Sequence, residues 1–323
     1  MTEDRRLSPR MPDLAALELL AAVARTGSLG AAGREFGMTQ QAASARVRSM
    51  EAQTGVVLVR RSPRGSTLTE HGALVAEWGT AVLAAAHRVD TGLAGIRGES
   101  RDHLTVVASQ TIAEQLLPRW LVSSRAAAVD AGLTPPEVTL TASNSDGAVD
   151  AVRGGRADLG FVEAPDVPSD VRDRVVAHDE LVVVVAPTHP WAAPETTVDA
   201  ATLARTPLIT REAGSGTRLF LDAALRTVNG PDRTPVAPAA EMPTASGVRA
   251  AAAAGTGPAV ISRLAVEDDL AMGRLVCVRT AGLDLHRPLR AIWLGGATPP
   301  AGPARDLVEH IGHSTHTIRR TGR

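Results

Sequence analysis

Residues 27–55 read GSLGAAGREFGMTQQAASARVRSMEAQTG, and this stretch decides the fold of the N-terminal part of the chain. Glycines interrupt its helical pattern, and residues suited to capping a helix, Ser28 and Thr39, follow the breaks. An apolar pattern at helical spacing precedes it, from Leu14 to Val23. The spacing therefore predicts three short helices with a tight turn between the second and the third, which is the arrangement of a helix-turn-helix.

The third predicted helix has an apolar side and a polar side when its residues are placed at 100° steps. The apolar side holds Ala43, Val47 and Met50. The other side carries Gln41, Ala45 and Arg48, with Gln40 in the first turn and Ser44 beside them. Glutamine can bond adenine, and arginine can bond guanine or phosphate, so this side has the chemistry to face a DNA major groove.

A basic hairpin is expected after the third helix. Residues 56–59 and 66–69 predict two short strands around a Pro-Arg-Gly turn, which would place Arg60, Arg61 and Arg64 near phosphates. Six arginines face two acids between Arg34 and Arg64, although an ordinary solvated surface would explain this charge equally well.

Composition narrows the classes of function. The chain has 323 residues, 44% of them hydrophobic, and 34 basic against 35 acidic residues, which predicts a globular protein of about two domains. Every basic residue is arginine and no tyrosine occurs, so mechanisms based on a lysine Schiff base, a phosphate-binding lysine or a tyrosine acid are excluded. Cys277 is the only cysteine, which excludes an internal disulfide, and its valine-rich surroundings predict a buried side chain.

The first twelve residues lack the apolar core of a signal peptide, and no apolar run approaches the roughly 18 residues that span a membrane. We therefore expect a soluble cytoplasmic protein that has no membrane partner.

From Glu70 to about Gly98 the chain predicts one long alanine-rich helix. Apolar residues recur along it at alternating steps of three and four, with one skipped position: Val75, Trp78, Val82, Ala85, Val89 and Ile96. This heptad spacing is typical of a helix that pairs with a second copy, although a helix packed on its own domain would show a similar pattern.

From Leu104 onward, strand and helix patterns alternate, with a single helix expected from Ile112 to Val129. This alternation predicts a largely parallel sheet covered by helices. The pattern divides into two α/β lobes, with crossings near His178 and Leu275 and a cleft between the lobes. Small polar residues end several strand-to-helix turns, around Ser109, Asn144 and Ser215. Helix N-termini that converge on a cleft would hold an anion, whereas each polar residue taken alone is better explained as a helix cap.

Residues 13–72 resemble the winged helix-turn-helix of LysR-type transcriptional regulators. The runs that carry the likeness are Gly27-Ser28-Leu29, Thr39-Gln40-Gln41-Ala42-Ala43-Ser44, Gly55-Val56-Val57-Leu58 and Leu68-Thr69-Glu70-His71-Gly72. The second half is similar to the effector domain of the same family, through runs such as 111–118, 155–163, 211–218 and 254–260. Ala45 stands where the family usually has arginine, so the residues expected to matter more for reading DNA are Gln40, Gln41, Ser44 and Arg48.

The resemblance implies an α/β protein: an all-α winged helix-turn-helix at 1–69, a linker and dimerisation helix at 70–98, and a two-lobed effector domain at 99–323. Lobe 1 would cover about 102–178 and 275–318, and lobe 2 about 179–274. Expected contacts with double-stranded promoter DNA are Ser28, Thr39, Gln40, Gln41, Ser44, Arg46, Arg48, Arg60, Arg61 and Arg64. Expected contacts with a small, anionic effector are Ser109, Thr111, Asn144, Glu163, Arg211, Ser215 and Thr217. A homodimer or homotetramer is implied, with no cofactor, no metal and no catalytic residue.

Two other classes of function are alternatives to this interpretation. One is a cytoplasmic solute-binding receptor whose N-terminal module docks a protein and not DNA. An enzyme has less support, because no nucleophile elbow, zincin pair or dinucleotide fingerprint is present. His310, His313 and His316 could bind a metal, but a solvated C-terminal tail explains them better.

Overall fold

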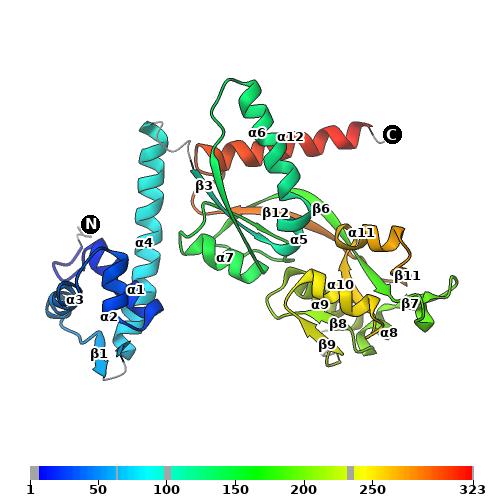
Figure 1. Ribbon diagram of the computed structural model, residues 1–323, viewed down its shortest axis with the longest axis horizontal. Helices are drawn as coiled ribbons and strands as arrows, with labels where there is room; N and C mark the ends of the chain where they lie inside the picture. Colours follow the sequence, from blue (N-terminus) through cyan, green and yellow to red (C-terminus); the bar gives the residue numbers. More distant parts are fainter. Residues whose placement is uncertain (1–6, 63–64, 98–102, 231–235, 322–323) are drawn as a thin grey trace, which may run out of the picture. The chain divides into compact units, whose positions relative to one another are not determined.

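The computed structural model describes residues 7–62, 65–97, 103–230 and 236–321, and the chain separates into two compact units, Met1–Leu93 and Ala94–Arg323 (Figure 1). Among the described residues, no helix is long and apolar enough to cross a membrane.

The first unit begins with three helices: α1 (Leu14–Thr26), α2 (Leu29–Glu35) and α3 (Gln40–Thr54). Side-chain oxygens of Asp13, Ser28 and Thr39 cap them by accepting hydrogen bonds from backbone N–H groups in the first turn. Gly27 and Gly55 end α1 and α3 in the left-handed conformation, with φ of 64° and 79°. The predicted helices and their caps are therefore present in the structure.

The hairpin after α3 consists of β1 (Val59–Ser62) and β2 (Gly65–Leu68), paired antiparallel with Val59 opposite Leu68. The prediction placed the first strand at residues 56–59, three residues too early. The difference arises because Glu51 of α3 holds the chain before the hairpin. Its Oε1 accepts hydrogen bonds from the backbone N–H groups of Leu58 and Val59, at 2.8 and 3.1 Å. Leu58 is consequently buried in the core of the unit and does not enter the ladder.

Helix α4 (Glu70–Arg97) is a single long helix, as its pattern predicts. Ala76 and Leu83 are buried against Leu17 and Leu20 of α1, with Val75 and Val82 partly buried beside them. By contrast, the side chains of Trp78 and Val89 are each 63% exposed. The apolar residues at heptad spacing therefore do not all lie on one surface. Val75 and Val82 pack on their own unit, whereas Trp78 and Val89 face solvent. The side chain of Ile96 lies outside the described residues.

The second unit is built on one continuous ten-stranded sheet with two lobes (Figure 1). In lobe 1 the strand order is β4 (Glu137–Ser143), β3 (His103–Ser109), β5 (Leu159–Val162) and β12 (His286–Trp293). The long strand β6 (Arg172–Val185) continues into lobe 2, where β10 (Ala259–Ser262), β8 (Ile209–Arg211) and β9 (Ala240–Met242) follow in order. β11 (Val276–Ala281) pairs with β6 and with β7 (Thr197–Asp199).

Helices cover both faces of each lobe. In lobe 1, α5 (Gln110–Gln115), α6 (Leu117–Asp130) and α12 (Pro303–Thr321) pack on one face, and α7 (Ser145–Arg153) packs on the other. In lobe 2, α8 (Ala200–Arg205) and α9 (Gly216–Asn229) oppose α10 (Ala245–Ala253) and α11 (Arg263–Ala271), and a short 3-10 turn lies at Pro190–Ala192. Alternate side chains of β6 point to opposite faces of the sheet. Val183 lies in the core under α8 and α9, and Val182 and Val184 lie in the core under α10 and α11.

Two details differ from the sequence-based expectation. The single helix predicted from Ile112 to Val129 is divided into α5 and α6, because Pro118 lies at the start of α6 and disfavours a continuous helix. The second crossing lies in β12 and not near Leu275, because Cys277 and Val278 of β11 pair with β6 inside lobe 2. Lobe 2 therefore extends to about Leu285, which is buried in its core.

Cys277 was expected to be buried, and this expectation is wrong: its side chain is exposed. β11 alternates its faces, so Val278 enters the core of lobe 2 and Cys277 faces outward.

Candidate functional site

The outward face of α3 carries part of the predicted DNA-binding set. Gln40, Gln41 and Arg48 are exposed, whereas Ala43, Val47 and Met50 are buried. Ser44 is 8% exposed, so it faces the interior and not the side of Gln41 and Arg48. The sequence had placed Ser44 beside Gln41, Ala45 and Arg48, and that placement is wrong because α3 packs against the other helices on the side of Ser44.

Three other predicted contacts hold the helices in place. Ser28 caps α2 through a 3.2 Å hydrogen bond from the backbone N–H of Ala31, and Thr39 caps α3 through an equal bond from Ala42. Arg46 donates from Nη2 to both carboxylate oxygens of Asp13, at 3.0 and 3.2 Å, which ties α3 to the start of α1.

The same aspartate is stabilised in its ionised form. The backbone N–H of Ala16 and then the Arg46 guanidinium hold the pKa of Asp13 below its usual value. Arg46 thus pairs with the residue that caps α1 and helps to hold α3 against it.

The hairpin carries the remaining basic residues. Arg60 lies in β1 with an exposed side chain. Arg61 also lies in β1, but its side chain is outside the described part of the structure, as is the whole of Arg64. The face of α3 and the exposed Arg60 therefore form the described portion of the candidate nucleic-acid surface.

The polar turns of the two lobes meet in the second unit. The backbone N–H of Asp146, at the start of α7, donates to Gly214 O at 3.3 Å, and Asn144 Nδ2 donates to Ala213 O at 3.4 Å. A β-carbon added to Gly216 would lie 2.5 Å from both Glu163 Cγ and Ser145 Oγ. The two lobes are therefore in close contact across the cleft, and glycine at position 216 permits this approach.

Arg287 lies at the centre of these contacts and is fully buried. Its Nη2 lies 2.8 Å from Glu163 Oε2 and 2.7 Å from Asp179 Oδ2, and its Nε also donates to Asp179, at 2.9 Å. Nη1 donates to Thr217 Oγ1 at 3.1 Å, and Nη2 reaches Thr111 Oγ1 at 3.5 Å. One guanidinium thus connects three of the predicted effector contacts, Thr111, Glu163 and Thr217.

Sequence reasoning missed Arg287, Asp179 and Ser262, whose hydroxyl donates to Asp179 Oδ1 at 2.9 Å. Arg287 and Asp179 face each other in the register of β12 with β6. The only sequence signal was a charged residue within a segment of strand pattern, 286–293, and register between distant strands cannot be derived from that.

The capping explanation holds for one predicted effector contact and not for two others. Asn144 caps α7, since its Oδ1 accepts the N–H of Gly147 at 2.8 Å. Ser109 and Ser215 precede α5 and α9 without a side-chain capping bond. Each serine is 1% exposed, and neither Oγ has a hydrogen-bond partner among the described residues. Buried hydroxyls of this kind are normally satisfied by water or by a ligand.

Arg211 is also buried, but its guanidinium forms two 2.8 Å hydrogen bonds with its neighbour Glu212. Arg218, in the first turn of α9, pairs with Glu241 at 2.5 Å. Both arginines are therefore engaged by acidic residues, and Arg287 is the arginine that contacts the predicted cleft residues.

The C-terminal histidines form no metal site in the described part of the chain. His310 Nε2 lies 2.8 Å from Ser123 Oγ, and His313 Nδ1 lies 2.7 Å from Glu309 O. No group of three or more metal-ligating side chains occurs among the described residues, and the side chain of His316 lies outside them.

A winged helix-turn-helix and a two-lobed α/β unit with a polar cleft together define a class, the DNA-binding regulators that carry an effector domain. The sequence pattern described as "Bacterial regulatory helix-turn-helix protein, lysR family" matches residues 14–73, and that of the "LysR substrate binding domain" matches residues 97–315. The chain therefore belongs to the LysR family of transcriptional regulators. This is a family of regulators and not typically of enzymes.

Individual relatives agree with this assignment. The chain is 55% identical over 305 residues to the HTH-type transcriptional regulator Rv2282c of Mycobacterium tuberculosis, covering 94% of this chain and 98% of that protein. Full-length OxyR C199D from Pseudomonas aeruginosa has a similar fold, with a TM-score of 0.64 at 21% identity, covering 93% of this chain and 95% of that one. CbnR complexed with its target DNA gives a TM-score of 0.60 at 22% identity, covering 94% of this chain and 100% of CbnR.

Proposed function

We propose that the protein acts in the cytoplasm, binds double-stranded promoter DNA as a homodimer or homotetramer, and is switched by a small molecule with an acidic group held between its lobes. In this assignment residues 1–69 bind DNA, 70–98 pair the subunits and 99–323 bind the effector. The observation that carries the proposal is the exposed polar face of α3, where Gln40, Gln41 and Arg48 have no competing role in the core.

The contacts separate the residues proposed to bind DNA from those that position the helices. Gln40, Gln41, Arg48 and Arg60 touch DNA, joined by Arg61 and Arg64 of the hairpin. Ser28, Thr39 and Arg46 set the position of the helices through the caps and the ion pair to Asp13. Ser44 supports α3 from the inside.

For the effector, the buried hydroxyls of Ser109 and Ser215 are the groups that would receive an acidic moiety. Thr111, Glu163 and Thr217 contact Arg287, so an effector that displaces one of these side chains would change contacts in both lobes. Asn144 and Arg211 frame the site from the turns that precede α7 and α9. An effector switches the protein only if it binds two arrangements with different affinity.

Fluorescence anisotropy of the full-length protein tests DNA binding directly. The probe is the DNA upstream of its own gene, with scrambled DNA as the comparison, across a salt series. We expect sequence-selective binding whose affinity falls steeply with salt, because phosphate contacts release counterions. Arg48→Ala should cost about 1–3 kcal/mol if Arg48 bonds a base, or lower the salt slope by about one if it bonds a phosphate.

Arg226→Ala is the matched control, because it removes the same charge from an exposed position in the other unit. It should leave the affinity and the salt slope unchanged. Equal binding to both DNAs, together with insensitivity to Arg48→Ala and Gln41→Ala, would contradict the proposed contacts and favour a module that docks a protein.

A further inference from the structure

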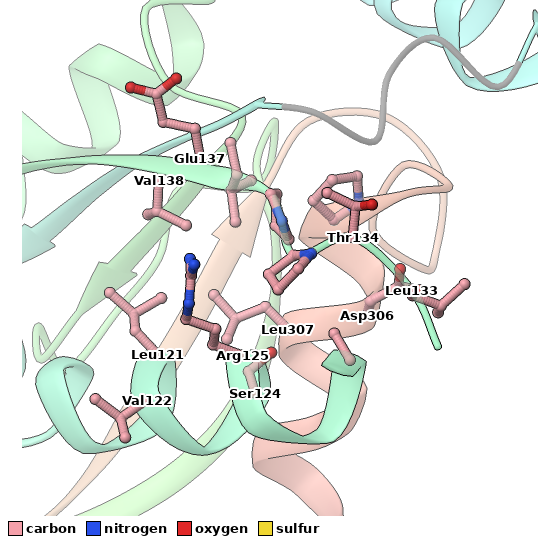
Figure 2. Close-up of a pocket in the computed structure, with 15 residues that line it drawn as sticks. Leu121, Val122, Ser124, Arg125, Leu133, Thr134, Glu137, Val138, Asp306 and Leu307 are labelled. Atoms are coloured by element: carbon pink, nitrogen blue, oxygen red, sulfur yellow. The ribbon is translucent and has the colours of Figure 1, made fainter. Parts of the chain in front are cut away.

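Lobe 1 contains a cavity of about 370 Å³ at the end of the sheet opposite the cleft (Figure 2). Its walls come from α6, from the first turn of α12 and from the segment at 133–138 that leads into β4. Leu104 and Val138 line it near the amino ends of β3 and β4, whereas the cleft residues Ser109 and Asn144 follow the carboxyl ends. At roughly 3.3 Å per residue, the strands separate the two sites by more than about 15 Å.

The cavity has a rigid, mainly apolar wall. Pro135 and Pro136 form part of it, and because proline fixes φ they limit how far this segment can close onto the helices. The apolar side chains that line the cavity include Leu104, Leu121, Leu133, Val138 and Leu307. A volume of 300–1,000 Å³ with such a lining is typical of small-molecule sites.

One cationic group lies at the cavity. Arg125 extends from α6 between Leu121 and Leu307 toward Val138 (Figure 2). Within the described part of the chain it has no ion pair or hydrogen bond. Arg153, by comparison, is held by Asp170 at 2.6 Å. A guanidinium beside apolar side chains can still donate to an acid in a two-pronged geometry.

Two acidic residues also line the cavity, and their placement matters. The carboxylate of Glu137 points away from the cavity, and Asp306 lies on the other side of Leu307 from Arg125 (Figure 2). Neither forms an ion pair with Arg125 among the described residues. The Arg125 end of the cavity is therefore the end that favours an anion.

We propose that this cavity is a second small-molecule site, separate from the cleft, and that it takes a monocarboxylic acid with an apolar body. The carboxylate pairs with Arg125, and the apolar body replaces water against Leu121, Val138 and Leu307. This site does not depend on DNA binding or on the identity of the effector in the cleft.

Isothermal titration calorimetry of the full-length protein tests the site, with octanoate and benzoate as probes and octanol, octylamine and benzyl alcohol as matched controls. We expect at least one acid to bind more than ten-fold more tightly than its alcohol and amine counterparts. Arg125→Gln should weaken that binding at least ten-fold. Arg119→Gln removes an exposed arginine of the same helix that does not line the cavity, and it should have no effect.

A second pair of variants tests the location without touching the charge. Ala128→Leu places a larger side chain in the cavity and should abolish binding, whereas Ala127→Leu, on the exposed neighbouring position of α6, should not. The proposal is overturned if neither acid binds, if the alcohol binds as tightly as the acid, or if binding survives both Arg125→Gln and Ala128→Leu.

Discussion

Arg287 shows how one residue can unite two lobes. Its guanidinium is buried with two carboxylates, Glu163 and Asp179, and with the hydroxyls of Thr111 and Thr217. A buried ion pair adds little net stability when it is intact, but removal of one partner leaves a buried charge without compensation. The intact network is therefore expected to add little to the free energy of unfolding. Loss of Arg287, by contrast, would leave Glu163 and Asp179 buried without a counterion.

Arg287→Met is expected to lower the free energy of unfolding of the second unit by about 3–5 kcal/mol, because Glu163 and Asp179 would remain buried without their counterion. Arg290→Met is the matched control on the same strand. Arg290 pairs with Asp173 at a half-buried position, so its loss should cost about 1 kcal/mol or less. Urea unfolding followed by tryptophan fluorescence measures both, and equal losses would contradict the role given to Arg287.

Asp222 gives a pH-dependent prediction. Burial raises the pKa of its carboxyl above the usual value, against the opposing effect of Arg218 and Arg226. A carboxyl whose pKa is higher in the folded state than in the unfolded state costs stability once the pH rises above the unfolded value of about 4. Asp222→Asn should therefore stabilise the protein more at pH 7.5 than at pH 4.5 in urea unfolding. A gain that is the same at both values would show that ionisation is not the cause.

At the scale of elements, the start of α4 is positioned by its contact with the segment that precedes β1. Thr69 Oγ1 donates to Val57 O at 2.7 Å and accepts the N–H of Gly72 at 2.9 Å. A β-carbon on Gly72 would lie 2.0 Å from Leu58 O, which is backbone and cannot turn aside. Glycine at this position is required by the close approach of α4 to the chain before β1.

Gly72→Ala is expected to destabilise the first unit by about 1–3 kcal/mol, the usual cost of overpacking. Gly30→Ala in α2 is the control, because its added β-carbon would meet only the side chain of Gln40, at 3.5 Å. Alanine is also the better helix former, so this variant should be neutral or slightly stabilised. Thermal unfolding monitored by circular dichroism compares the two, and an unchanged midpoint for Gly72→Ala would contradict the packing argument.

At the scale of the whole molecule, several apolar side chains of α4 are exposed to solvent. Leu74, Trp78, Val89 and Leu93 are between 41% and 63% exposed. On a helical projection they fall on one stripe, away from the buried Ala76 and Leu83. Covering this stripe with a second copy of α4 would remove it from water, which is the physical basis for the proposed dimer.

Trp78→Glu is expected to raise the dimer dissociation constant at least ten-fold, because a buried tryptophan contributes about 150–250 Å² of contact area. Ala73→Glu introduces the same side chain at an exposed position on a different face of α4 and should leave the dimer intact. Light scattering coupled to gel filtration, over a dilution series, measures the mass of each. A wild-type protein that is monomeric throughout would rule out the pairing.

The sequence alone was sufficient for the local features of the first unit. Helix boundaries at Gly27 and Gly55, the caps at Ser28 and Thr39, and the inward set of Ala43, Val47 and Met50 depend on residues within one or two turns of each other. The alternation of strands and helices in the second half could be predicted for the same reason. Such features follow from backbone preference and periodicity, which short segments carry by themselves.

Only the tertiary structure decided which side chains meet. Arg287 and Asp179 are 108 positions apart, and Arg287 and Thr111 are 176 apart, and they come together through the register of β6 with β12 and the contact between lobes. The exposure of Cys277, the inward turn of Ser44 and the ion pair of Arg46 with Asp13 likewise depend on what packs against each element. Contacts between distant segments depend on the packing of the whole chain, so a local pattern can name candidate residues but cannot choose their partners.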